Sequence, residues 1–374
     1  MKYLFLLLTL STIFLNTAIA QELGVNFNET ISYAKDPQTI SRTETTWVRG
    51  FLDFFEYMEN PKKLTDPKGD LAAFLNLQKH GFKTILSLKF RFRKATIPYP
   101  TSEEAQVYLD FLSEILDHVW GKIDIIVIGN EPYIESKREE WDTKLPAFYK
   151  SLCIHTHNYG KGKTALPIYF GAFNKLYEQD WQTQGVDEML DFVRQESWLS
   201  GVNIHIHHSS NDQISSIYNY VDERIRRDQK VLITEFSLVH WWKTNNLDSI
   251  PGEFAKSYGY PKHQKVHEYI LFALNNPRPK QEWDDFLKNS PWFEERKNYL
   301  TEAYEIFKSY ESFHVATYPY RIKWGKNYSS TSMPWLINNL IAGVTVKANP
   351  KTGEDQFNYH FIEDFKEIQS KVEK

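Results

Sequence analysis

The sequence predicts an α/β protein in which eight strand and helix units close into a single barrel, the (β/α)8 or TIM-barrel fold. Short runs of apolar and β-branched residues recur eight times along the chain, and they alternate with segments of helical periodicity. The runs are apolar throughout, which is typical of parallel strands that helices cover. Eight such units favour closure of the sheet into a barrel. An open, doubly wound sheet is the alternative, but no G-x-G-x-x-G motif follows the first run.

The individual elements follow from these runs and from helix start and stop signals. A Thr101/Glu104 capping-box pattern opens the longest predicted helix, and Gly121 closes it. Gly81 similarly closes the first predicted helix. The predicted strands are residues 23–27, 46–51, 83–88, 123–129, 167–171, 202–207, 230–235 and 314–324. The predicted helices are residues 70–79, 101–120, 186–196, 214–227, 264–274 and 299–310.

The first twenty residues have the pattern of a secretory signal peptide. Lys2 precedes an apolar run over residues 3–15, and the Ala18-Ile19-Ala20 triplet is a small-x-small cleavage site. The run is too short for a membrane span. We therefore expect cleavage near Ala20, a secreted or periplasmic protein, and one barrel domain over residues 21–374. Cys153 is the only cysteine, so the core must hold this domain without an intrachain disulfide.

Composition narrows the classes of partner. The chain has 44 basic and 48 acidic side chains and a net charge of −4, which argues against a nucleic-acid partner. After the leader, no apolar run is long enough to predict a membrane partner. The 11 Trp, 22 Tyr and 25 Phe exceed what a core needs. Some are therefore available to stack on the rings of a carbohydrate, the predicted partner of a protein that we expect to be a monomer.

Two of the predicted strands end in a glutamate. The fourth runs Ile125-Ile126-Val127-Ile128-Gly129-Asn130-Glu131-Pro132, and the seventh runs Val231-Leu232-Ile233-Thr234-Glu235. A glutamate is almost never fully buried without a partner, so these endings need a reason. In a (β/α)8 barrel, polar residues at the carboxyl ends of strands converge on one pocket. Two carboxylates that meet at one mouth are what glycoside hydrolysis requires.

With the eight-unit pattern, these two motifs resemble clan A, the large clan of retaining glycoside hydrolases whose (β/α)8 barrel carries catalytic glutamates on strands four and seven. The resemblance covers nearly all of the chain after the leader in architecture, but only a few short motifs in sequence. It implies that Glu131 is the acid/base and Glu235 the nucleophile. It also implies that Asn130 contacts the sugar 2-hydroxyl and that Arg49, on strand two, lies near the nucleophile.

Strand six departs from the clan pattern. The clan often has His-x-Tyr there, whereas this chain reads His205-Ile206-His207-His208. A histidine thus stands where the clan has a tyrosine, and the departure leaves open which side chain orients Glu235. We expect His205 and His207 to be hydrogen-bonding neighbours of the carboxylates and of the substrate.

Electrostatics supports the paired roles. Two carboxylates about 5 Å apart repel by roughly 3 kcal/mol at an effective dielectric constant near 20. One therefore keeps its proton and protonates the leaving oxygen, while the other attacks the anomeric carbon. The expected enzyme is a retaining hydrolase of a poly- or oligosaccharide that needs no cofactor and no metal.

Basic and aromatic segments are candidates for substrate binding. Lys89-Phe90-Arg91-Phe92-Arg93-Lys94 follows the third strand, and residues 320–326, which include Trp324, surround the end of the eighth. If the first segment is extended, Arg91 lies on the same side as its other alternate cations. These cations suit a sulfated or uronate-containing glycan. The alternative is a solvated rim that pairs with acidic neighbours.

Aromatic side chains near the strand ends are further candidates. Trp241 and Trp242 follow the nucleophile strand closely enough to form a stacking platform, although core packing is the alternative. Trp324 and Trp335 are additional candidates, and Tyr133 is expected beside Glu131. The segment over residues 237–313 is longer than one barrel helix needs, so we expect it to build one wall of the cleft.

Two other functions remain open. His205 and His207 alternate on one strand and point the same way, so a metal-dependent hydrolase is one alternative. Such a barrel would be expected to carry His-x-His on its first strand, but Val25-Asn26-Phe27-Asn28 has none. The other alternative is a barrel that binds glycan without cleaving it, and the two strand-end glutamates argue against it.

Overall fold

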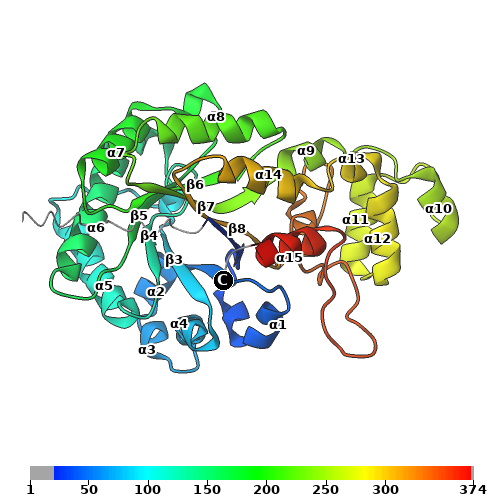
Figure 1. The fold of residues 1–374 in the computed structure, drawn as a ribbon, viewed down its shortest axis with the longest axis horizontal. Helices are drawn as coiled ribbons and strands as arrows, with labels where there is room; N and C mark the ends of the chain where they lie inside the picture. The colour runs from blue at the N-terminus through cyan, green and yellow to red at the C-terminus, as the bar shows by residue number, and fades with distance from the viewer. Residues whose placement is uncertain (1–20, 372–374) are drawn as a thin grey trace, which may run out of the picture.

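The computed structural model describes residues 21–371, so the predicted signal peptide, residues 1–20, lies outside them. Eight parallel strands form a closed barrel in sequence order, and β8 pairs with β1 to complete the ring (Figure 1). The predicted barrel is confirmed, and the open sheet is wrong. The strands are β1 (Glu22–Asn26), β2 (Trp47–Asp53), β3 (Lys83–Lys89), β4 (Ile125–Ile128), β5 (Ile168–Asn174), β6 (Gly201–His207), β7 (Lys230–Ser237) and β8 (Phe313–Pro319).

Helices cover the outside of the barrel, each with its apolar face inward. On α7, for example, Val186, Met189, Leu190 and Val193 follow the i, i+3, i+4, i+7 spacing and are all buried. Between residues 21 and 371, no helix is both long and apolar enough to cross a membrane. The helices around the barrel are α1 (Pro37–Ser41), α2 (Phe54–Glu59), α3 (Lys62–Thr65), α4 (Asp70–Leu75), α5 (Glu103–Val119), α6 (Lys144–Gly160), α7 (Gln184–Gln195), α8 (Asn211–Asp222), α14 (Tyr299–Lys308) and α15 (Phe361–Lys371). Short 3-10 turns are η1 (Ile31–Lys35), η2 (Leu77–His80), η3 (Phe92–Lys94), η4 (Arg138–Glu140), η5 (Gln179–Trp181) and η6 (Trp335–Ile337).

Element boundaries differ from the sequence prediction in places with a physical cause. The N-cap of α5 is Ser102, whose side chain accepts from the Ala105 N–H at 3.1 Å, so the Thr101 capping box is wrong. The helix predicted over residues 70–79 is divided at Asn76 into α4 and η2. Strand β8 ends at Pro319, because proline has no N–H for the ladder.

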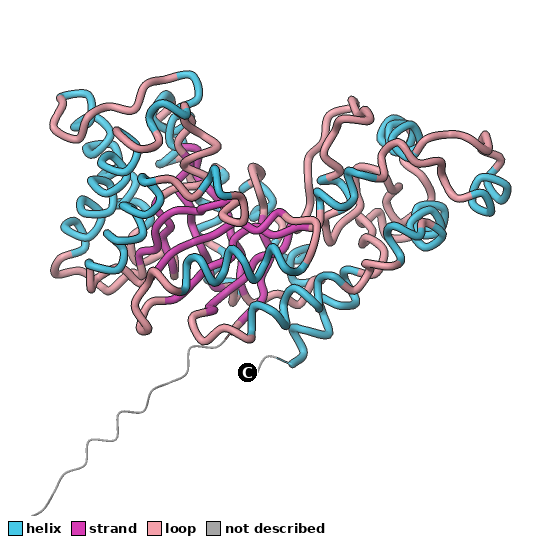
Figure 2. Tube along the Cα trace, turned by 90° about the horizontal axis from the view of Figure 1, so that it is seen from above, coloured by secondary structure: helices cyan, strands magenta, loops and turns pink. Residues whose placement is uncertain are grey.

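A group of helices between β7 and α14 lies beside the barrel rather than around it, as both views show (Figures 1 and 2). Trp242 joins this group to the barrel wall: its ring packs 6.3 Å from Phe293 and 5.5 Å from Tyr299 of α14, centroid to centroid. The hydrophobic core is therefore continuous between the two parts, and we retain one domain as a prediction. The helices are α9 (Val239–Thr244), α10 (Gly252–Tyr258), α11 (Val266–Asn275), α12 (Lys280–Asn289) and α13 (Pro291–Glu294).

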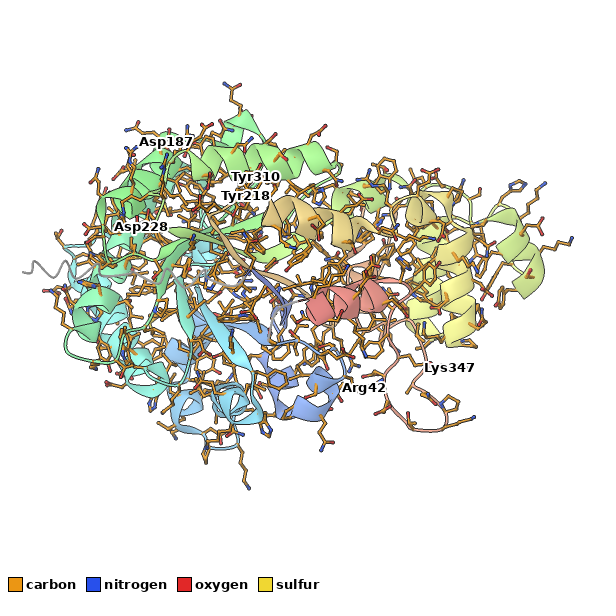
Figure 3. All side chains as sticks on the ribbon, viewed as in Figure 1. Arg42, Asp187, Tyr218, Asp228, Tyr310 and Lys347 are labelled. Atoms are coloured by element: carbon orange, nitrogen blue, oxygen red, sulfur yellow. The ribbon has the colours of Figure 1, made fainter. Side chains whose placement is uncertain are left out.

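Aromatic and polar contacts hold the last helices against the barrel. Tyr218 of α8 stacks on Tyr310, just beyond α14, with ring centroids 3.8 Å apart (Figure 3). On α15, Gln369 donates to the carbonyl of Leu23 in β1 at 2.6 Å. The last helix of the barrel thus packs against its first strand.

The interior of the barrel changes from apolar to polar along its axis. One end is filled by a cluster of seven buried side chains, Trp47, Ile85, Ile125, Val127, Tyr169, Leu232 and Val315. Further along the strands the buried side chains are polar, and they include Asn26, Arg49, Ser87, Asn203 and Thr234. Buried polar groups need partners, so this second layer is where a hydrogen-bond network must form.

Candidate active site

The carboxyl ends of the strands surround a cavity of about 380 Å³ that contains both predicted catalytic glutamates. Its position agrees with the general location of active sites in this fold. The lining residues are Asn28, Glu29, Phe51, Lys89, Asn130, Glu131, Ile134, Asn174, Lys175, His207, Glu235, His240, Pro319, Ile322, Met333, Trp335, Asn338 and Asn339.

Glu131 reaches the cavity through an unusual backbone. Gly129 has a φ of 118°, and a Cβ there would lie 2.6 Å from the carbonyl oxygen of Gly171. Glu131 itself has a φ of 48°, in the left-handed region that residues with side chains seldom adopt. Strain of this kind costs on the order of 1–3 kcal/mol and clusters at functional sites. The end of β4 is therefore built to aim one side chain rather than to continue a strand.

A bulge in β7 places Glu235. The register with β6 pairs Ile204 with Ile233 but His205 with Glu235, so Thr234 is an extra residue. Thr234 contacts His205 inside the barrel, and Glu235, the next residue, also reaches the interior. Bulges re-aim side chains next to active sites in this way.

Arg49 holds Glu235 in position from the interior of the barrel. Its guanidinium is fully buried and donates from Nη1 to Glu235 Oε1 at 2.8 Å. The same side chain donates to Asn130 Oδ1 at 2.5 Å, to Asn26 Oδ1 at 3.1 Å and to Ser87 Oγ at 3.1 Å. Four acceptors, three from strands β1, β3 and β7 and one just beyond the end of β4, thus hold one cation in place. Arg49 gives Glu235 a permanent counter-charge. Among the described residues, the only cationic partners of Glu131 are histidines.

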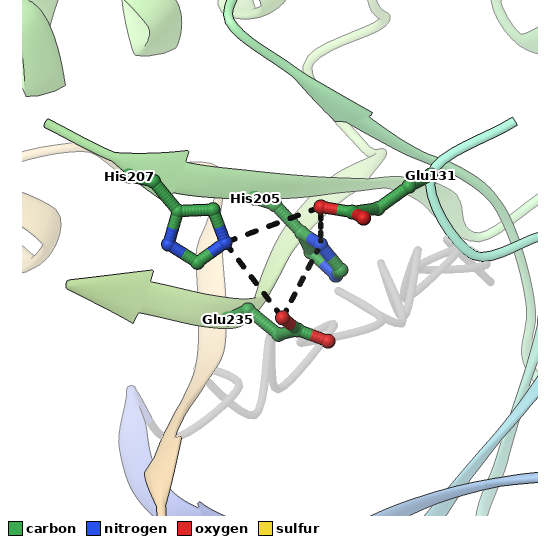
Figure 4. A group of neighbouring side chains, drawn as sticks. All are labelled: Glu131, His205, His207 and Glu235. Atoms are coloured by element: carbon green, nitrogen blue, oxygen red, sulfur yellow. Dashed lines mark hydrogen bonds and ion pairs between the residues drawn. The ribbon is translucent and has the colours of Figure 1, made fainter. Parts of the chain in front are cut away.

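Two histidines lie between the carboxylates (Figure 4). His205 Nδ1 lies 3.1 Å from Glu131 Oε1 and 3.8 Å from Glu235 Oε2. His207 Nε2 lies 4.0 Å and 3.7 Å from the same two oxygens. All four ligand atoms are within 4.8 Å of one another, so a carboxylate oxygen of Glu131 lies within that distance of one of Glu235.

The surroundings shift both carboxyl groups in the same direction but not equally. Burial raises the pKa of Glu131, but the hydrogen bond and charge of His205 outweigh it and leave the pKa below its ordinary value. Burial also raises the pKa of Glu235, but His205, His207 and Arg49 together hold that pKa well below its ordinary value. Glu235 is therefore the group that stays ionised more firmly.

The structure brings together most of the predicted site around this pair. Asn130 lines the cavity, and no residue among 21–371 accepts from its Nδ2. His207 also lines the cavity and stands beside Glu235 where the clan has a tyrosine. Arg49 and His205 are fully buried behind the carboxylates, so they hold these groups and do not line the cavity. Trp335 of η6 lines the cavity and packs edge-on against His207 at 4.7 Å.

Four of the predicted aromatic residues do not line this cavity. Tyr133 is buried against Trp141, 5.0 Å between centroids, and its hydroxyl faces the sulfur of Met189. Trp242 is a core residue, as described above. The remaining two are tied down by backbone carbonyls: Trp241 donates to Trp292 at 3.0 Å, and Trp324 donates to Asn327 at 3.1 Å. Sequence proximity to a strand end could not distinguish these rings from Trp335.

Two of the cations near the cavity mouth, Lys89 and Arg91, already have acidic partners. Lys89 lies 2.8 Å from Glu29 and 3.1 Å from Glu135. Arg91 lies 2.6 Å from Asp53 and lines a neighbouring cavity of about 300 Å³ instead of the one between the glutamates. Arg91 therefore does not line the cavity between the glutamates, and its role in substrate binding stays a prediction. Lys175 does line that cavity, and it has no acidic partner among residues 21–371.

Other residues of the site escaped the sequence analysis. Asn174 donates to Glu131 Oε1 at 3.1 Å from the end of β5. The predicted strand ended at Gly171, and the observed strand continues past a bulge at Ala172, so a longer strand would have placed Asn174 at a strand end. From the segment over residues 237–313, only His240 lines the cavity, so that segment does not build a wall. The wall comes from residues 319–339.

Comparisons with known proteins support the fold. No protein-family model matches the chain. No curated protein sequence matches it either.

Several solved structures match over nearly the whole chain. A glucosidase from Croceicoccus marinus matches 95% of this chain and 68% of its own, at 11% identity and a TM-score of 0.53. A GH10 endoxylanase retrieved from a sugarcane soil metagenome matches 94% and 97%, at 12% identity and 0.51. A fungal beta-1,4-galactanase matches 94% and 100%, at 11% identity and 0.53. At such identities these likenesses show the fold alone.

Proposed function

We propose that this protein is a retaining glycoside hydrolase that cleaves a poly- or oligosaccharide with Glu131 and Glu235. One observation carries the proposal: carboxylate oxygens from the ends of β4 and β7 lie within 4.8 Å of each other in a cavity. Carboxyl groups about 5–5.5 Å apart are typical of retaining enzymes, whereas inverting enzymes hold theirs about 6.5–9.5 Å apart to admit a water. The spacing therefore supports retention.

Glu235 has the surroundings of a nucleophile, and Glu131, whose pKa is lowered less, is the carboxyl group of the pair that takes up a proton first and so serves as the acid/base. Arg49 keeps Glu235 ionised at 2.8 Å. In the first step a Glu235 oxygen bonds to the anomeric carbon while the bond from that carbon to the leaving oxygen breaks. The leaving oxygen takes the proton of Glu131, which becomes a carboxylate. His205, at 3.1 Å from Glu131 Oε1, stabilises this carboxylate as it forms.

The second step reverses these roles. The Glu131 carboxylate takes a proton from water, whose oxygen attacks the anomeric carbon and breaks its ester bond to Glu235. Glu235 returns to its carboxylate form beside Arg49, and the product keeps the anomeric configuration of the substrate. Asn130 has its Oδ1 occupied by Arg49, which leaves its amide N–H groups to donate to a sugar hydroxyl.

The pairing of Lys89 and Arg91 with carboxylates favours a neutral glycan as the preferred substrate, and Lys175 is the cation of the cavity that has no acidic partner among residues 21–371. Because Lys89 and Arg91 are paired with Glu29 and Asp53, a sulfate or uronate group would have to displace a carboxylate to reach them. The prediction of an anionic glycan is thus weakened. Trp335 offers an apolar ring in the cavity beside His207, which suits stacking on a sugar face. We further propose, from the N-terminal pattern, that the protein acts outside the cytoplasm.

A polysaccharide panel tests the proposal. The chain without residues 1–20 is incubated with neutral, sulfated and uronate-containing glycans, and the products are sized by chromatography. We expect cleavage of at least one neutral glycan and no cleavage by Glu235→Gln. An NMR time course of the first product should show a retained anomeric configuration. Inversion, or equal cleavage by the variant, would refute the assigned mechanism.

A further inference from the structure

We infer that Glu131, His205, His207 and Glu235 also form a binding site for a divalent transition-metal ion of the Zn²⁺ class, and that its occupation blocks hydrolysis. The inhibitory part rests on the proposed function, whereas the binding part rests on geometry alone. These four side chains converge on one point at the cavity floor (Figure 4).

The spacing of the donor atoms is close to that of a tetrahedral site. Zinc bonds to imidazole nitrogen and carboxylate oxygen are about 2.0–2.2 Å long, so neighbouring donors in a tetrahedron lie roughly 3.4 Å apart. The four measured nitrogen to oxygen distances are 3.1, 3.8, 4.0 and 3.7 Å. The separations between the two nitrogens and between the two oxygens are within 4.8 Å, so side-chain movements of up to roughly 1 Å would close these donors around an ion.

The second nitrogen of each imidazole is held as in metal sites. His205 Nε2 lies 2.9 Å from Thr234 Oγ1, and His207 Nδ1 lies 2.8 Å from Ser237 Oγ. Such partners fix the ring orientation and leave the opposite nitrogen for an ion. These hydrogen bonds do not involve the carboxylates. They direct the free nitrogen of each imidazole toward the point at which the four side chains meet.

The donor set favours a late transition metal over Mg²⁺ or Ca²⁺. Imidazole suits zinc, copper and nickel, whereas magnesium and calcium prefer a complete set of oxygen ligands. Glu131, His207 and Glu235 are each partly accessible, at 19%, 12% and 17% side-chain exposure, so an ion can enter from the cavity.

Four protein ligands make this a closed site. Catalytic zinc sites keep three protein ligands and leave the fourth position to water or substrate, whereas structural sites fill all four. An ion held by the quartet would occupy both Glu131 and Glu235, so neither could transfer a proton nor attack carbon. The geometry therefore points to inhibition and away from a metal-dependent hydrolase.

Titration calorimetry on chelator-treated protein without residues 1–20 tests the site, with ZnCl₂ as the probe. We expect one high-affinity site per chain, and a loss of affinity in His207→Gln greater than the ~10–100-fold typical for an outer partner. His240→Gln is the matched control, because His240 lines the same cavity outside the quartet and should leave zinc affinity unchanged. Co²⁺ in place of Zn²⁺ should give the visible absorption of a tetrahedral ion, lost in His207→Gln.

Turnover measured in parallel separates this inference from the proposed function. We expect zinc to inhibit cleavage at the concentration at which it binds, with full recovery on chelation. Absence of binding, or binding that His207→Gln leaves intact, would overturn the site. Stimulation by zinc would overturn inhibition and favour the metal-dependent hydrolase. Zinc binding to the quartet in a protein that cleaves no glycan would uphold the site and refute the proposed function.

Discussion

Both ends of the barrel carry a glutamate beside a cation, but the two arrangements differ in what the carboxylate faces. At the amino ends of the strands, Glu22 accepts from Lys83 Nζ at 2.8 Å and from Thr46 Oγ1 at 3.0 Å. At the carboxyl ends, Glu235 accepts from Arg49 at 2.8 Å, and its other oxygen faces His205, His207 and a second carboxylate.

This difference teaches that burial and pairing alone do not mark a catalytic carboxylate. Glu22 is only 4% exposed and paired, and so is typical of a structural acid. Glu235 is set against Glu131 in a cavity, an arrangement that repels and that folding alone has no reason to build. Strain at Glu131 adds to the cost. Costs concentrated at one end of the barrel indicate function there.

The largest expected effect separates the two ends directly. Glu235→Gln removes the nucleophile, and kcat should fall on the order of 10⁴-fold or more. Glu22→Gln makes the same chemical change at the opposite end and should leave kcat within about twofold, because the distant end of the barrel takes no part in chemistry. Steady-state kinetics on both variants measures this contrast. Equal losses would mean that the mouth is not the site.

The second effect concerns Glu131 and depends on the leaving group. Glu131→Gln cannot donate a proton, so cleavage of a natural glycoside should slow by about 10²–10⁴-fold. An aryl glycoside whose phenol leaves without a proton should lose far less in the first step. The comparison of kcat/KM on the two substrates measures proton donation. A loss that is the same on both would contradict the acid role of Glu131.

The third effect tests the cation behind the nucleophile. Arg49→Met leaves Glu235 without its buried counter-charge, and we expect kcat to fall about 10²-fold and the free energy of unfolding to fall by about 3 kcal/mol. Arg49 lowers the pKa of Glu235, so that pKa should rise in the variant. Because Glu235 acts ionised, the acid limb of the kcat/KM profile should move to higher pH. Arg49→Lys keeps the positive charge but not the bidentate geometry of the guanidinium, so the acid limb of the kcat/KM profile should stay at the same pH.

The fourth effect compares two tryptophans that the sequence could not separate. Trp335→Ala removes an apolar ring from the cavity and should lower kcat/KM by about tenfold, mainly through KM. Trp324→Ala removes a ring whose indole donates to Asn327 outside the cavity, and it should leave KM unchanged. If both variants bind substrate equally well, the ring of Trp335 is not a stacking platform.

The sequence was sufficient where a signal was local and periodic. The eight apolar runs predicted the closed barrel, and the strand-end positions of Asn130, Glu131 and Glu235 brought them to one cavity. The His205 and His207 alternation also predicted their common direction. In each case the two-residue period of a strand determines which side of the sheet a side chain faces, and the barrel fold determines at which end of the strands the site lies.

The sequence was insufficient where long-range packing decides. Trp241, Trp324 and Trp335 each lie at or beyond the end of a predicted strand, so their positions in the sequence do not distinguish them. The path of residues 319–339 brings Trp335 to the cavity. Asn174 was missed because the bulge at Ala172 prolongs β5 beyond its apolar run. The partner of Arg91, Asp53, is the last residue of β2, so this ion pair could not be predicted from an alternating basic segment.

The smallest expected effect concerns Glu22, at the amino ends of the strands. Burial raises the pKa of Glu22, but Lys83, by its hydrogen bond and charge, and neighbouring hydrogen-bond donors such as Thr46 together outweigh burial and leave the pKa below the ordinary 4.5. Ionised Glu22 therefore stabilises the fold above that value, and the contribution is lost as the pH falls through the folded pKa. Lys83 is half exposed, so the contribution is about 1 kcal/mol at most.

Glu22→Gln should thus unfold more easily than the natural protein at pH 7 and equally easily once the pH is below the folded pKa of Glu22, in urea titrations at each pH. The matched variant at the mouth, Glu235→Gln, should behave differently. It relieves the repulsion between two carboxylates but leaves the charge of Arg49 uncompensated. A stability loss at pH 7 larger for Glu235→Gln than for Glu22→Gln would mean that the Arg49 ion pair outweighs that repulsion. The reverse order would mean that the mouth sacrifices stability for the close approach of its two carboxylates.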